Sequence, residues 1–134
     1  MTIQLALTVR NGLLDYIETA IGASAVLKIR SGAAPADCAA ADAGTVLATL
    51  NLPADWMAAA AAGSKAMSGT WQDTSADAAG TAGHFRLYTS GATCMLQGTI
   101  TVTGGGGDMT LDNTVLAAGQ EFSVTQFTLN APNA

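Results

Sequence analysis

Beyond Gly22, short segments of the chain have an apolar residue at every second position. In the segment 25–30, for example, Leu27 and Ile29 alternate with a lysine and an arginine. Such alternation places apolar side chains on one face of a β-strand and polar side chains on the other. Clusters of Gly, Ser, Asn and Asp separate the alternating segments, as turns do between strands. The pattern predicts a mainly β protein, a single antiparallel β-sandwich or jelly-roll-like domain whose strands have one solvated face.

About seven strands are expected, at the spacing typical of such a domain. In the last of them the parity changes, because Phe122 and Val124 share one face whereas Phe127 and Leu129 share the other. A β-bulge near residues 125–126 would bring both pairs into the core. The predicted strands span residues 25–30, 45–52, 67–72, 84–88, 96–103, 108–111 and 122–129.

The N-terminal segment has a helical period instead. Between residues 4 and 21, apolar side chains recur at intervals of three and four, and Gly22 suits the end of a helix. We therefore expect an N-terminal α-helix or arm in residues 1–22 and the β-sandwich domain in residues 23–134. The predicted apolar face of the helix comprises Val9, Leu13, Tyr16, Ile17, Ala20 and Ile21.

Charge excludes several classes of partner. The 134 residues include 5 Lys and Arg against 10 Asp and Glu, which gives a net charge of −5. Nucleic-acid binding requires cationic side chains that neutralise phosphates, so neither a nucleic acid nor an anionic membrane surface is an expected partner. Charged residues make up 11% of the chain, less than half the usual share of about 25%. A surface so poor in charge favours contacts with other proteins, because little charge has to be desolvated.

The chain has the length of one domain. Its first basic residue, Arg10, follows the apolar N-terminal run, which is the reverse of the order in a secretory signal. The apolar runs are also too short to predict a transmembrane helix. Synthesis in the cytoplasm is therefore expected.

Catalytic chemistry is not expected. A nucleophile needs a base within hydrogen-bonding reach, and the one histidine, His84, begins a strand on the parity that should face solvent or a neighbouring subunit. Asp73 and Asp77, with Glu121, offer carboxylates for a glycosidase, but a solvated loop over residues 72–83 explains the two aspartates more simply. The chain is predicted not to be an enzyme.

No metal or cofactor is expected either. Cys38 and Cys94 are too few for a zinc site, and they are predicted to form either a disulfide or two reduced, buried thiols, the second being favoured in a protein made in the cytoplasm. Asp108, Asp112 and Asn113 carry oxygen ligands suited to calcium, yet their spacing does not match an EF-hand and fits exposed turns better.

Two tracts of biased composition predict the structure of connections between strands, and the two tryptophans are considered with them. The four glycines of residues 104–107 lack the lysine of a phosphate-binding loop and predict a hairpin loop. The Ala-rich tract after Asp55 suits a helical turn with that aspartate as its N-cap. Trp56 and Trp71 are most simply packing anchors, while exposure of Trp71 would make it a platform for a sugar.

The stretches 25–57 and 67–88 resemble segments of small proteins encoded by tailed bacteriophages and proteobacterial prophages. That resemblance implies a virion protein, and among such proteins of this size it implies a head decoration, or cement, protein of an HK97-like capsid. Proteins of that class bind the outside of the shell as dimers or trimers. The expected partners are accordingly the major capsid protein and further copies of this chain, and the expected location is the capsid surface of the virion.

The N-terminal segment is the expected contact element, because it is more apolar than a free terminus should be. Two aromatic residues of the β-domain are added to it as candidate contacts. The predicted partner-binding residues are Ile3, Leu5, Leu7, Val9, Leu13, Tyr16, Trp71 and Tyr88.

A recognition module remains the alternative. A tail-tip or fibre-associated domain, or a carbohydrate-binding β-sandwich, would use Trp71, Tyr88 and the Asp-containing loop 72–83 to contact a host glycan.

Overall fold

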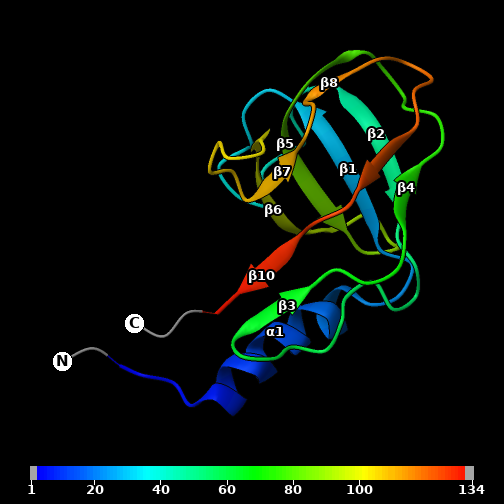
Figure 1. The fold of residues 1–134 in the computed structure, drawn as a ribbon. Helices are drawn as coiled ribbons and strands as arrows, with labels where there is room; N and C mark the ends of the chain where they lie inside the picture. The colour runs from blue at the N-terminus through cyan, green and yellow to red at the C-terminus, as the bar shows by residue number, and fades with distance from the viewer. Residues whose placement is uncertain (1–2, 132–134) are drawn as a thin grey trace.

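In the computed structural model, which describes residues 3–131, the chain is mainly β with one helix (Figure 1). This confirms the fold class at that level. The elements are α1 (Leu7–Ile21), β1 (Val26–Ser31), β2 (Val46–Asn51), β3 (Ser64–Ala66), β4 (Trp71–Asp73), β5 (Gly80–Tyr88), β6 (Cys94–Val102), β7 (Met109–Leu111), β8 (Val115–Leu116), β9 (Phe122–Val124) and β10 (Thr128–Asn130).

The main sheet is curled and has the strand order β2-β1-β5-β6-β7, with β8 paired to β5 (Figure 1). Its four long strands, β1, β2, β5 and β6, lie where the period-two alternation predicts strands, although β5 begins four residues before His84. Pairing within this group is antiparallel. The sheet as a whole is mixed, because β7 pairs with β6 in parallel and places Met109 beside Ile100.

The glycine run explains how two consecutive strands come to be parallel. We expected residues 104–107 to close a hairpin, but the chain turns back beside β6 and then turns again before β7 begins. The returning segment lies so close that a Cβ atom on Gly107 would be 2.9 Å from the backbone nitrogen of Thr101. Gly104 and Gly106 have φ values of +85° and +84°, which residues with a side chain rarely adopt.

The C-terminal segment forms two strands rather than one bulged strand. β9 pairs with β4, and β10 pairs with β3, so the expected bulge near residues 125–126 is replaced by a break between two separate ladders. The change of parity has the predicted effect on burial, since Phe122, Val124 and Phe127 are all in the core. The break between β9 and β10 lets both parities reach the core, because each short strand is oriented by a different partner strand.

A row of aromatic rings runs through the core. Trp56 lies 6.1 Å from Trp71, Trp71 lies 5.7 Å from Phe127, and Phe127 lies 5.5 Å from Phe85, between ring centroids. The indole N–H of Trp71 donates to the carbonyl oxygen of Trp56 at 3.2 Å, and that of Trp56 donates to Gly22 at 3.1 Å. The two tryptophans are therefore packing anchors, and Trp56 also ties the end of α1 to the core.

The second face of the sheet is covered where we expected it to be wet. The connection between β1 and β2, residues 32–45, folds back over β5 and β6, so Arg30 and Arg86 are buried beneath it. Strand alternation correctly assigns these side chains to the face opposite the core. The tract after Asp55 also differs from expectation, because it contains no helical turn within the described chain and instead forms a turn that leads into β3.

Candidate functional site

Helix α1 packs on the β-domain through a polar stripe. Asn11, Asp15 and Glu18 are spaced so that they lie on one side of the helix. The Asn11 Oδ1 atom accepts the amide N–H of Gly63 at 2.9 Å, and the Asp15 carboxylate lies 2.8 Å from the Nζ atom of Lys65. Glu18 lies 3.3 Å from the same ammonium. The helix is thus held by hydrogen bonds and ion pairs to β3 and the turn before it.

Lys65 is the centre of this contact and is almost completely buried. Burial alone would lower its pKa, but the hydrogen bonds with Asp15 and Glu18 outweigh that effect and raise the pKa. Its ammonium also donates to the carbonyl oxygen of Ala58 at 2.8 Å. The same hydrogen bond from Lys65, together with one from the amide of Ala60, lowers the pKa of Asp15. Each partner therefore stabilises the charged form of the other.

Because the polar stripe points inward, most of the predicted apolar face points outward. Val9, Leu13 and Tyr16 are 48%, 53% and 67% exposed, whereas Leu14 and Ile21 are buried. The helical period is present, but only Ile17 and Ile21 of the predicted apolar face pack against the core. The predicted partner-binding residues of the N-terminal segment are all exposed: Ile3, Leu5, Leu7, Val9, Leu13 and Tyr16.

The two predicted contact residues of the β-domain lie elsewhere. Trp71 is 1% exposed in the aromatic row, and Tyr88 is 5% exposed beneath the loop 32–45. A partner at the surface cannot reach either side chain directly. The structure therefore does not bring Trp71 and Tyr88 together with the N-terminal contact residues, and their inclusion in that surface is corrected.

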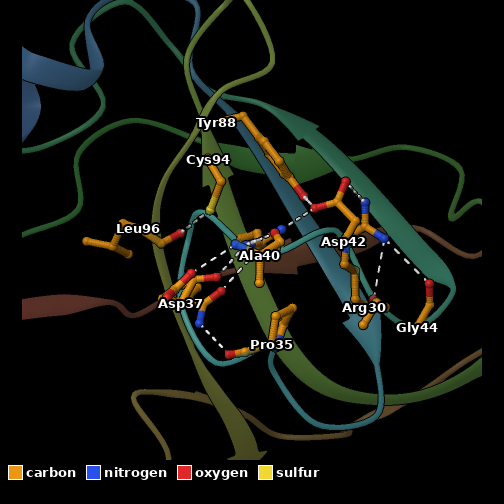
Figure 2. Close-up of polar contacts among 12 residues, drawn as sticks. Arg30, Pro35, Asp37, Ala40, Asp42, Gly44, Tyr88, Cys94 and Leu96 are labelled. Carbon is orange, nitrogen blue, oxygen red and sulfur yellow. Dashed lines mark hydrogen bonds and ion pairs between the residues drawn. The ribbon is translucent and has the colours of Figure 1, made fainter.

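The covering loop encloses a polar cluster around Asp42 (Figure 2). Arg30 donates to one carboxylate oxygen of Asp42 at 2.9 Å, and Arg86 donates to the other. The hydroxyl of Tyr88 donates to that second oxygen at 2.7 Å. Both guanidiniums are buried, while the side chain of Asp42 is 43% exposed to solvent. One carboxylate on the loop thereby compensates two cations on the sheet.

The electrostatics of the cluster follow from these contacts. The Tyr88 hydroxyl, with the guanidiniums of Arg86 and Arg30, lowers the pKa of Asp42 even though burial opposes this. Burial and the hydrogen bond to Asp42 raise the pKa of Tyr88. At neutral pH, Asp42 is therefore a carboxylate and Tyr88 a neutral donor, which is the combination that the hydrogen bonds need.

His84 is buried, which contradicts its expected exposure. The loop covers it, and its Nδ1 atom lies 2.9 Å from the carbonyl oxygen of Gly32, which can only accept a hydrogen bond. The backbone of Gly32 passes so near β5 that a Cβ atom on Gly83 would lie 2.2 Å from that same oxygen. His84 is thus a packed residue that binds the loop, and Gly83 provides the space for it.

The acidic residues considered for catalysis or calcium binding have separate local partners. Asp73 accepts the amide N–H of Thr49 at 2.9 Å, and Asp77 accepts its hydroxyl at 2.7 Å, so both cover the edge of β2. Asp108 accepts from Thr99. Glu121 and Asp112 are exposed. Within residues 3–131, His, Cys, Asp and Glu form no group of three or more that is suited to a metal ion.

The Asp42 cluster was not predicted from the sequence, although a signal for it exists. Arg30 and Arg86 share one face of two paired strands, in a chain that has only five lysines and arginines. Such a concentration of positive charge requires a nearby carboxylate. The low-complexity tract 32–44 contains two candidates for this carboxylate, Asp37 and Asp42.

Comparisons with protein-family models, with curated proteins and with solved structures found no match to this chain. Among residues 3–131, no helix has both the length and the apolar character needed to cross a bilayer.

Proposed function

We propose that this protein is a non-enzymatic structural protein of a tailed-phage virion, and that it acts as a capsid decoration, or cement, protein. In this role it binds the outside of the major capsid shell and stabilises it. The observation that carries the proposal is the orientation of α1, which turns its polar stripe to the β-domain and its apolar stripe to the exterior.

The outward stripe suits a contact with another protein. Val9, Leu13 and Tyr16 leave about half or more of their surface in water, whereas burying a large apolar side chain contributes roughly 1.5–3 kcal/mol. The inward contacts of Asn11 and Asp15 fix the helix in this rotation, so the stripe is presented without any rearrangement. A contact of this modest size becomes strong when symmetry repeats it across a shell.

The position of the helix also favours docking. Helix α1 lies with β3 and β10 at one end of the molecule, away from the curled sheet (Figure 1). A shell surface can therefore approach α1 without meeting the main sheet. We propose that the curled sheet and the β4–β9 pair form a sandwich-like or jelly-roll-like scaffold above the shell, and that copies of the chain associate there as dimers or trimers.

Cosedimentation with undecorated capsids tests the proposal, using the cognate HK97-like shell. The wild-type protein should saturate at a copy number set by the symmetry of the shell. A variant with both Leu13→Asp and Tyr16→Asp should lose at least about tenfold in affinity, because two charges enter the apolar contact. Val102→Asp is the matched control, since Val102 is 50% exposed at the end of β6, and it should bind as the wild type does.

Salt dependence separates this contact from an electrostatic one. An apolar contact should change by less than about threefold between 50 and 500 mM salt, because little charge is screened. Equal loss of binding in the α1 variant and in Val102→Asp would contradict the assignment of the stripe. A change of oligomeric state in the α1 variant alone would show instead that the stripe joins copies of this chain.

The recognition-module alternative lacks an exposed aromatic surface on Trp71 or Tyr88 for binding a sugar. A glycan would have to stack on Trp71 or Tyr88, and both side chains are buried. Saturable glycan binding by a protein that does not bind capsids would nevertheless favour a tail-tip or fibre-associated role over the shell.

A further inference from the structure

The turn that carries Cys38 is clamped to the sheet on both sides. The Nη2 atom of Arg86 donates to the carbonyl oxygens of Asp37 at 2.9 Å and Ala40 at 3.1 Å. Before the turn, the side-chain amide of Gln97 donates to the carbonyl oxygen of Pro35 at 2.7 Å. These hydrogen bonds hold the backbone on either side of Cys38 over β5 and β6.

Cys94 lies directly below this turn. It is the first residue of β6 and pairs in register with Tyr88, whose hydroxyl anchors Asp42 at the far end of the same loop. Figure 2 shows its sulfur directed toward the segment that contains Asp37 and Ala40. Both cysteines are free, half-buried thiols, and Cys38 lies near enough to Cys94 to affect the pKa of the Cys94 thiol. The Cys94 thiol donates to the carbonyl oxygen of Leu96 at 3.7 Å.

We propose that Cys38 and Cys94 are a latent cross-linking site, which forms an intramolecular disulfide on exposure to a low-molecular-weight disulfide such as oxidised glutathione. The bond fastens the loop 32–45 covalently to β6. This inference rests on the loop and the sheet alone and is independent of the proposed role in a virion.

The chemistry is a double thiol–disulfide exchange. The thiolate of Cys38 attacks one sulfur of oxidised glutathione, breaks its S–S bond and releases one glutathione thiolate. Cys94 then loses its proton to water and attacks the sulfur of Cys38, which expels the second glutathione thiolate. The two cysteines lose two electrons and two protons, and one glutathione disulfide becomes two molecules of reduced glutathione.

The environment of Cys94 supports this order of attack. Burial and the adjacent Cys38 thiol raise the pKa of Cys94 to about 11. Its thiol is therefore protonated at neutral pH and is the poorer first nucleophile. Ring closure should accordingly accelerate as the pH rises, by up to about tenfold per unit while the Cys94 thiol remains mostly protonated.

Intact-mass measurement after incubation with oxidised glutathione provides the test. The wild-type protein should lose about 2 Da, the mass of two hydrogens, and should carry no glutathione. Trypsin should then release the peptide 31–65 joined to the peptide 87–134, since these contain Cys38 and Cys94. Closing so long a ring should raise the melting temperature by about 10 °C, and dithiothreitol should reverse the rise.

Two single variants are the controls. Cys38→Ser and Cys94→Ser each leave one thiol, which should take up one glutathione without any rise in melting temperature. Both reduced variants should melt close to the reduced wild type, which confirms that they fold. Wild-type protein that carries two glutathiones, that forms disulfide-linked dimers at low concentration, or that does not react would overturn the proposal.

Discussion

The Nζ atom of Lys65 lies 2.8 Å from the carboxylate of Asp15, although 50 positions separate the two residues along the chain. This ion pair joins β3 to α1, and Glu18 completes it from the next turn of the helix. It is one of the contacts that keep the polar stripe of α1 inward, and therefore one of those that keep Leu13 and Tyr16 outward.

Removal of this ammonium should loosen the helix. Lys65→Met is expected to lower the free energy of unfolding by about 2 kcal/mol, because it leaves the carbonyl oxygen of Ala58 and two carboxylates without their donor. Urea unfolding measures the loss, and hydrogen exchange should be faster in α1. Lys28→Met is the control, since Lys28 is half-buried over the ring of Tyr88, and it should cost less than about 1 kcal/mol. Equal losses would contradict the role of Lys65.

Stability should fall in acid partly through Asp42. Its pKa is lowered in the folded protein, so its contribution is fully present above the unfolded value of about 3.9 and is lost as the pH falls toward the folded pKa. Asp42→Asn should be less stable at pH 7, because it weakens the compensation of two buried guanidiniums. It should also lose less stability than the wild type between pH 5 and pH 2.

Urea unfolding of both proteins across that pH range measures the difference. Asp77→Asn is a suitable control, since it changes an exposed carboxylate that bonds the Thr49 hydroxyl outside the cluster. Parallel stability curves for the wild type and Asp42→Asn would show that Asp42 has no part in the acid dependence.

Gly83 should not accept a side chain. A Cβ atom there would lie 2.2 Å from the carbonyl oxygen of Gly32, so Gly83→Ala must displace backbone and should cost at least about 2 kcal/mol. Gly91→Ala places its Cβ atom 3.7 Å from a side-chain oxygen of Thr89, which is an ordinary contact, and should change stability by less than about 0.5 kcal/mol. Thermal melts of the two variants distinguish these outcomes. A Gly83→Ala protein as stable as the wild type would mean that the loop does not approach β5.

Gly12 should be replaceable with a gain. It lies inside α1 with nothing within 4 Å of its Cβ position, so Gly12→Ala should stabilise the protein by about 1 kcal/mol through helix propensity. Gly22 ends the same helix at a φ of +83°, and Gly22→Ala should destabilise it. Calorimetry of both variants tests whether the melting temperature rises in Gly12→Ala and falls in Gly22→Ala. A destabilising Gly12→Ala would show that this position is not helical.

The pattern of apolar residues located most of the elements of the fold. Alternation marks β1, β2, β5 and β6 because each lies with one face on a continuous core. A strand with one buried face has apolar residues at every second position, and this pattern can be recognised within a single short segment. The parallel direction of β7 was not foreseen. It depends on how the backbone of residues 104–107 packs against Thr101, and apolar periodicity does not report the path of a loop.

The candidate sites were less predictable than the strands. Helical periodicity located α1, but it could not show which stripe packs inward, because Asn11 and Asp15 find their partners 52 and 45 positions away. For the same reason, alternation placed Arg86 and His84 on the correct face without showing that a distant loop covers it. In both places the outcome depends on polar contacts between residues that are remote in the sequence.

The anchoring of the loop 32–45 has a consequence for its variation during evolution. Its first part is anchored at two carbonyl oxygens, because His84 binds Gly32 and Gln97 binds Pro35. Between Asp37 and Asp42 the spacing is constrained, because Arg86 binds both of them from one position on the sheet. Homologous chains should therefore keep the number of residues that separates Gly32 from Asp42, even where the sequence of the loop has changed.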